Sequence, residues 1–139
     1  MVNEMKIGIV VSEYNYDITM MMLQRAKEHA EFLGAEVAEI MKVPGTFEIP
    51  LGAKKLLESG KVDGVATLGA VIQGETDHDD IIMQNAARKI MDLSIEFGKP
   101  VSLGITGPGQ TRLQAEARIE KARDSVESVV KMLRKIGKN

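Results

Sequence analysis

One histidine lies within a few residues of a flexible glycine, a hydroxyl and several acids. Gly74, Thr76 and His78 all fall in the segment 73–80, Gln-Gly-Glu-Thr-Asp-His-Asp-Asp. Glycine can adopt positive φ and leaves the neighbouring backbone N–H groups unobstructed, and threonine adds a hydroxyl donor. Because amides at a helix start carry partial positive charge, we expect this segment to bind an anion such as phosphate. An imidazole beside that anion can exchange protons near neutral pH, so His78 is the expected proton-transfer residue.

A histidine among acids can instead be a solvated residue at a helix start, with the acids at 77–80 capping the helix. Its position in the chain favours chemistry. The residues just before it, 65–72, are almost all aliphatic and often β-branched, as in a strand buried on both faces of a parallel sheet. Open α/β sheets bind ligands beyond the carboxyl ends of such strands. The loop after residue 72 is therefore the candidate reaction centre.

The rest of the chain alternates strand and helix patterns that can position this loop. Strands are expected at 6–11, 36–43, 65–72 and 100–105. Apolar residues at helical spacing predict helices at 18–33, 46–58, 79–97 and 113–136, and a turn is expected at 106–109. The alternation predicts an α/β fold with a four-stranded parallel sheet and helices on both faces, and right-handed crossovers favour the strand order 2-1-3-4. Without a linker or repeat, we expect one domain over residues 1–139.

Composition excludes several classes of partner. The 139 residues carry a net charge of −2 with acids and bases mixed, which favours a small-molecule substrate over nucleic acid or anionic lipid. The absence of cysteine excludes disulfides, thiolate catalysis and cysteine metal sites, and it fits a reducing compartment. The first residues lack a charged region followed by an apolar signal core, and no apolar run reaches membrane-spanning length. We expect a cytoplasmic protein without membrane association.

Further side chains could join the same crevice. Thr46 and Glu48 follow the second expected strand, where they would present a hydroxyl and a carboxylate, although helix capping is the alternative. The last helix and its approach carry several cations, and a guanidinium there could bind phosphate bidentately over residues 74–76. The alternative is that these cations are solvated surface. His29 falls within the first helical pattern, where a surface or partly packed position is expected.

Taken together, four segments resemble the 6,7-dimethyl-8-ribityllumazine synthase family over essentially the whole chain: 14–15, 43–50, 68–78 and 85–87. The resemblance implies a flavodoxin-like doubly wound fold. It also implies condensation of 5-amino-6-(D-ribitylamino)uracil with 3,4-dihydroxy-2-butanone 4-phosphate, the penultimate step of riboflavin biosynthesis, with neither metal nor cofactor. Riboflavin synthase would act downstream. Members of the family form pentamers, sometimes assembled into a 60-subunit shell, with active sites between subunits.

The resemblance also assigns roles to individual residues, with Tyr14 expected to stack on the pyrimidine and Leu103 expected from the adjacent subunit. The residues it assigns to the pyrimidine and ribityl groups are Tyr14, Asn15, Gly45, Thr46, Phe47, Glu48, Val71, Ile72 and Leu103. Those it assigns to phosphate are Gly74, Glu75, Thr76 and Arg118, and His78 is the catalytic residue. Segment 119–124 departs from the family pattern, which leaves open whether Lys121 or Arg123 replaces a family lysine.

Three other classes of protein share this layer arrangement. Archaeal-type riboflavin synthase shares the fold and part of the Val-Pro-Gly segment, but generally lacks the Gly-Glu-Thr-x-His stretch. A receiver module needs an acidic pair after the first strand and an aspartate ending the third. Here Glu13 alone and the pair Ala70-Val71 occupy those places. A flavodoxin needs a hydroxyl- and glycine-rich loop after the first strand, which segment 12–15 is not.

Overall fold

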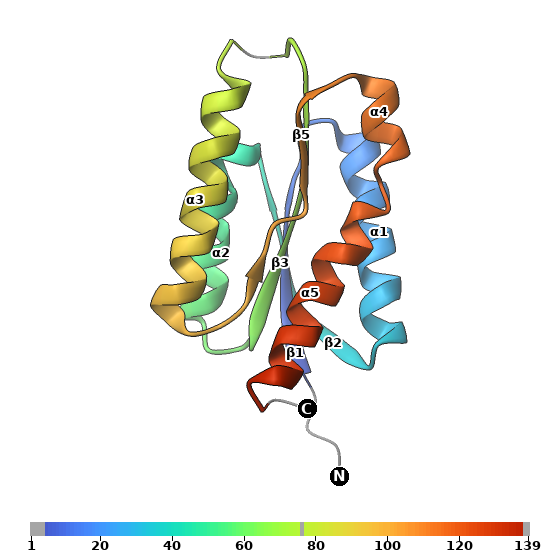
Figure 1. The fold of residues 1–139 in the computed structure, drawn as a ribbon. Helices are drawn as coiled ribbons and strands as arrows, with labels where there is room; N and C mark the ends of the chain where they lie inside the picture. Colours follow the sequence, from blue (N-terminus) through green and yellow to red (C-terminus); the bar gives the residue numbers. More distant parts are fainter. Residues whose placement is uncertain (1–4, 76, 138–139) are drawn as a thin grey trace.

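The computed structural model describes residues 5–75 and 77–137, and within these ranges strands alternate with helices (Figure 1). The elements, in chain order, are β1 (Met5–Ser12), α1 (Tyr16–Phe32), β2 (Ala35–Val43), the short 3-10 helix η1 (Thr46–Glu48), α2 (Ile49–Glu58), β3 (Gly64–Ile72), α3 (Asp79–Phe97), β4 (Val101–Ser102), β5 (Ile105–Gln110), α4 (Arg112–Ala117) and α5 (Lys121–Lys135). No helix in the described ranges combines the length and apolarity that crossing a bilayer requires.

The sheet is parallel throughout, with the order β2-β1-β3-β4, and β5 also pairs with β3. The predicted order 2-1-3-4 is therefore confirmed. Helices α2 and α3 lie on one side of this sheet, and α1, α4 and α5 lie on the other (Figure 1). The prediction of helices on both faces is also confirmed.

The fourth strand differs from the prediction, because it is split into β4 and β5 on the same side of β3. Gly104 lies at the break, where an added Cβ would collide with the Thr67 carbonyl and the Ser125 side chain. The Thr67 hydroxyl donates to the Ser102 carbonyl at 2.6 Å, and Ser125 Oγ donates to the Thr67 carbonyl at 3.0 Å. These buried side-chain bonds replace part of the backbone ladder at the break. The turn predicted at 106–109 is wrong, since these residues lie within β5.

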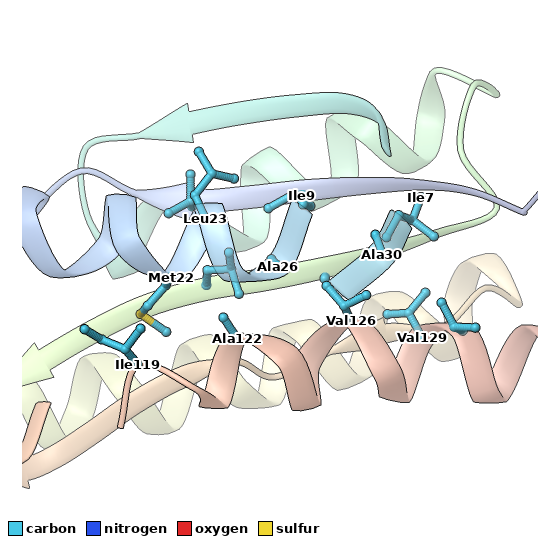
Figure 2. Packing of buried hydrophobic residues seen from close by; sticks show 14 of the residues in the cluster. Ile7, Ile9, Met22, Leu23, Ala26, Ala30, Ile119, Ala122, Val126 and Val129 are labelled. Atoms are coloured by element: carbon cyan, nitrogen blue, oxygen red, sulfur yellow. The ribbon is translucent and has the colours of Figure 1, made fainter. Parts of the chain in front are cut away.

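Two hydrophobic clusters hold the layers together. The larger one joins α1 and α5 to one face of the sheet, and Figure 2 shows Ile7 and Ile9 of β1 facing side chains from both helices. Ala26 on α1 and Ala122 on α5 are fully buried. Such small side chains let two helices approach closely and leave the larger Val126 to fill the space beside them (Figure 2). The second cluster packs α2 and α3 on the opposite face.

Helix boundaries match the prediction best where local signals are strong. Helix α3 spans the predicted 79–97 and ends at Gly98, which adopts the left-handed conformation at φ 63°. The helix predicted at 46–58 instead begins with η1 before α2. The predicted final helix, 113–136, is wrong because it is two helices. Thr111 caps α4 in a reciprocal pair with Gln114, and the chain leaves helical geometry at Arg118, with φ −107° and ψ 14°.

Candidate active site

The loops at the carboxyl ends of β1, β2 and β3 enclose a cavity of about 340 Å³. The predicted site residues that line it are Tyr14, Gly45, Thr46, Phe47, Glu48, Val71, Ile72 and Glu75. Pro44, Ala70, Asp79 and Ile82 also line it and were not predicted as site residues. The structure thus brings together residues from three separate segments. A cavity at this end of an open parallel sheet is the usual ligand position for the architecture.

Two aromatic rings stand at the cavity with much of their surface exposed. The Tyr14 side chain is 56% exposed and Phe47 is 73% exposed. The cavity is also lined by Val71 and Ile72, the last residues of β3, and by Ile82 of α3. Ile82 belongs to the apolar face that helical spacing predicted for α3, so its periodicity was a signal of its position. A mostly apolar cavity with flat rings at its edge suits a planar heterocycle.

Asn15, which was predicted to bind the substrate, does not line the cavity but links loops that border it. It adopts left-handed backbone geometry, with φ 62° and ψ 49°, directly before α1. Its amide nitrogen donates to the Ala70 carbonyl at 3.1 Å and to Glu75 Oε1 at 2.9 Å. These two bonds tie the β1–α1 loop to the end of β3 and to the following loop. They also hold the Glu75 carboxylate, which lines the cavity.

Glu48 is both a capping residue and a cavity residue. Its Oε1 accepts a hydrogen bond from the Gly45 backbone N–H at 2.9 Å, which closes the turn that begins η1. The helix-capping alternative expected for Glu48 is therefore present in the structure. Because a carboxylate has several acceptor positions, the same side chain can also accept from a ligand hydroxyl. Thr46 begins η1 beside it.

The β3–α3 loop has some of the features that predicted an anion-binding site. Gly74 has φ 84°, and an added Cβ would meet no atom within 4 Å. The Gln73 N–H donates to the Gln110 carbonyl at 2.7 Å, and the Glu75 N–H donates to the Ile72 carbonyl at 3.4 Å. The first-turn amides of α3, at 79–81, precede the helical hydrogen-bond ladder and point away from it. Thr76, predicted as a phosphate ligand, lies outside the described residues.

His78 occupies the N-cap position of α3, with φ −130° and ψ 27°. The helix predicted at 79–97 starts directly after it, so the cap position belongs to the histidine and not to the aspartates expected there. Asp79 and Asp80 instead form the first turn. The His78 side chain is exposed and does not line the cavity, whereas its neighbour Asp79 does. The structure therefore places His78 on the same loop as Gly74, at the cavity's edge.

Two predicted residues lie apart from this cavity. Arg118 and Leu103 line a second hollow of about 750 Å³, together with Lys121 and Arg123. This hollow borders β5, which lies beyond β3 on the side away from β1. Within one copy of the chain, the structure does not bring Arg118 or Leu103 to the residues that line the first cavity.

His29 lies at the packing contact between α1 and α5, as a partly packed helix residue. Its Nε2 is 2.9 Å from Glu127 Oε1, and Lys131 Nζ is 2.8 Å from Glu127 Oε2. Hydrogen bonds from Lys131 and then from His29 lower the pKa of the Glu127 carboxyl. Glu127 and Lys131 are four residues apart on α5, the spacing that brings two side chains together on one helix face. Within 5–75 and 77–137, no group of three or more His, Asp or Glu side chains is placed to hold a metal ion.

The fold and the first cavity define a doubly wound α/β protein with a cavity of small-molecule size beyond the carboxyl ends of its strands. A family model described as 6,7-dimethyl-8-ribityllumazine synthase matches residues 4–136. Proteins of that name from Picrophilus torridus and Archaeoglobus fulgidus are 62% and 57% identical to this chain. The matches cover 96% of this chain in both cases, and 98% and 93% of the two relatives. A relative of the same name from Methanothermobacter thermautotrophicus is 56% identical over 96% of each chain.

The chain belongs to the 6,7-dimethyl-8-ribityllumazine synthase family. The resemblance inferred from the four sequence segments is thereby confirmed, as is the flavodoxin-like fold class. The relatives bear the name of this enzyme, which excludes membership of the riboflavin synthase, flavodoxin or receiver families.

Proposed function

We infer that this protein is an enzyme of riboflavin biosynthesis. It condenses 5-amino-6-(D-ribitylamino)uracil with 3,4-dihydroxy-2-butanone 4-phosphate and releases phosphate, water and 6,7-dimethyl-8-ribityllumazine. The observation that carries this conclusion is the convergence of three loops on one cavity, lined by seven of the nine residues that the family resemblance assigns to the pyrimidine and ribityl groups. Identity above 50% along nearly the full chain agrees with it.

In this proposal the pyrimidine ring stacks on Tyr14, and its edge binds backbone groups at Val71 and Ile72. The ribityl chain extends toward Thr46 and Glu48, whose hydroxyl and carboxylate can pair with its hydroxyl groups. Support comes from the exposure of the Tyr14 ring and from the location of all four other residues around the same cavity.

The phosphate group is proposed to bind Gly74, Glu75 and Thr76 together with the first-turn amides of α3. The Glu75 carboxylate would repel a dianion and already accepts from the Asn15 amide, so Glu75 is proposed to contribute its backbone N–H, whose bond to the Ile72 carbonyl is long at 3.4 Å. The positive φ of Gly74 and the orientation of helix-start amides support this placement.

Arg118 and Leu103 are proposed to reach the site from a second copy of the chain, because both line a separate hollow beside β5. Lys121 is the better candidate than Arg123 for a second phosphate cation. Arg123 already pairs with Glu120 at 2.9 Å, whereas Lys121 has no carboxylate within 4.0 Å among the described residues. A site divided in this way requires assembly, and we propose a pentamer or a 60-subunit shell of pentamers.

Positioning of two substrates is proposed as the largest part of catalysis, because it replaces a bimolecular encounter with a reaction between held groups. The phosphate-binding loop orients the ketone of the butanone substrate and holds the phosphate group that is released. His78, at the start of α3, transfers protons during the condensation and contributes about 10²–10⁴ in rate. We further propose that residues 1–139 form one domain that acts in the cytoplasm. The lack of cysteine fits such a reducing compartment.

The test is to incubate the purified protein with both substrates and to follow lumazine fluorescence. His78→Ala is expected to lower kcat by about 10²–10⁴ with little change in either KM. Arg118→Ala is expected to raise the KM for the phosphate substrate selectively. Matched controls are His29→Ala, at the α1–α5 contact, and Arg134→Ala, whose guanidinium binds the Leu33 carbonyl. No fluorescent product from the wild-type protein would refute the function, and wild-type kinetics for His78→Ala would refute its role.

A further inference from the structure

We propose that Gln110 is the positioning residue for the Arg118 guanidinium, and that its neutral amide leaves the arginine charge available to the phosphate substrate. Gln110 is the last residue of β5 and is completely buried. Its Oε1 accepts a hydrogen bond from Arg118 Nη1 at 3.0 Å. The inference rests on the proposed role of Arg118 in binding phosphate.

The Gln110 side chain is held in one orientation. Its Nε2 donates to Thr106 Oγ1 at 2.8 Å, so the amide oxygen is the end that faces Arg118. A flipped amide would direct NH₂ at the guanidinium and lose the bond to Arg118, which has no acceptor, whereas the Thr106 hydroxyl can pair with either end of the amide. The backbone is also fixed, because the Gln110 carbonyl accepts from the Gln73 N–H at 2.7 Å, at the start of the β3–α3 loop.

This arrangement restrains a side chain that is otherwise mobile. Arg118 follows the last turn of α4 and is exposed, and a free arginine there loses rotamer entropy when it binds. One of its five N–H donors is used by Gln110, and the remaining donors can address an incoming oxyanion. Preorganisation of this kind improves affinity by reducing the entropy cost of binding.

The neutrality of the acceptor is as important as its position. A carboxylate at the same place would form a charge-assisted pair with the guanidinium and compete with phosphate for it. Glu120 and Asp124 line the same hollow, but Glu120 is engaged by Arg25 and Arg123, each at 2.9 Å. Among the described residues, Arg118 has no acidic oxygen within 4.0 Å. Its contact in this structure is an uncharged amide.

The experiment compares Gln110→Leu and Gln110→Glu with wild type by steady-state kinetics in both substrates. Gln110→Leu removes the acceptor, and the KM for the phosphate substrate should rise about tenfold, because the freed arginine side chain must then lose its rotamer entropy when it binds. Gln110→Glu keeps the shape but neutralises the arginine, so that KM should rise at least as much. The KM for the pyrimidine substrate should not change in either variant. Gln24→Leu is the matched control, since the Gln24 amide binds Glu28 on the surface of α1.

A double variant separates positioning from a merely structural role. If Gln110 acts through Arg118, Gln110→Leu should add nothing to the KM increase already caused by Arg118→Ala. Multiplying effects would overturn the inference, as would a wild-type KM in Gln110→Leu alongside a raised KM in Arg118→Ala. An unchanged KM in Arg118→Ala would refute the phosphate role of Arg118 and the inference with it. If Gln110→Leu fails to fold, Gln110→Glu and its double variant provide the same comparison.

Discussion

The positive φ of Gly74 allows the phosphate seat to be tested with a closely matched pair of substitutions. Gly74 and Gly60 have φ 84° and 73°, and an added Cβ at either position would meet no atom within 4 Å. Alanine should therefore cause backbone strain without a steric clash at both sites, costing about 1–2 kcal/mol. Gly60 lies directly after α2, beyond its C-cap Ser59, and lines neither cavity of the proposed site. The two variants should lose equal stability.

Only Gly74→Ala should affect binding. If each of the two turns relieves about 1 kcal/mol of strain by moving away from its native conformation, the binding-competent population of the Gly74 loop falls about fivefold, and the apparent KM for the phosphate substrate rises by the same factor. The assay measures thermal unfolding and both KM values for each variant. Equal melting temperatures with a raised KM in Gly74→Ala alone are expected. A wild-type KM in Gly74→Ala, or an equal increase in Gly60→Ala, would refute the reasoning about this loop.

Two further predictions concern stability. Ser125→Ala removes the hydroxyl that donates to the Thr67 carbonyl and should lower the free energy of unfolding by about 1–3 kcal/mol. Urea denaturation measures this change, and a loss below about 0.3 kcal/mol would contradict a stabilising role for these hydrogen bonds. Hydrogen bonds from Lys131 and then His29 lower the pKa of the Glu127 carboxyl, so the folded state favours its charged form. The resulting contribution to the free energy of unfolding is present above the ordinary glutamate pKa of about 4.3 and is lost as the pH falls through the lowered pKa. Glu127→Gln should therefore be less stable than wild type at neutral pH. Its stability should also fall less than that of wild type between pH 7 and 3, as measured by unfolding at each pH. Parallel pH profiles for the two proteins would contradict this.

The elements with strong local signals were predictable from sequence. The aliphatic run of β3 and the left-handed glycine after α3 mark element boundaries by themselves, so α3 was predicted at its observed residues. The cavity also followed, because parallel strands bring their carboxyl ends to one edge and loops that are far apart in sequence must then meet.

Features set by distant contacts were not predictable in this way. The break at Gly104 depends on Thr67 and Ser125, both remote in sequence. The segment 106–109 has turn composition yet lies within β5, which pairs with β3 on either side of a register shift between Thr106 and Gln110. The brace from Asn15 to Glu75 needs left-handed geometry that the residue type permits but does not require. Nothing in helical spacing indicates that Arg118 would sit at a break between two helices.

The central claim is that one site is built from two copies of the chain, with the cavity and His78 from one copy and Arg118 from the next. Subunit mixing tests it directly. His78→Ala and Arg118→Ala chains, each nearly inactive at a low concentration of the phosphate substrate, are unfolded together, refolded and assayed. Random assembly should leave about a quarter of the sites with both residues intact, and activity should rise toward a quarter of wild type. Activity no greater than the average of the two separately refolded variants would contradict the claim.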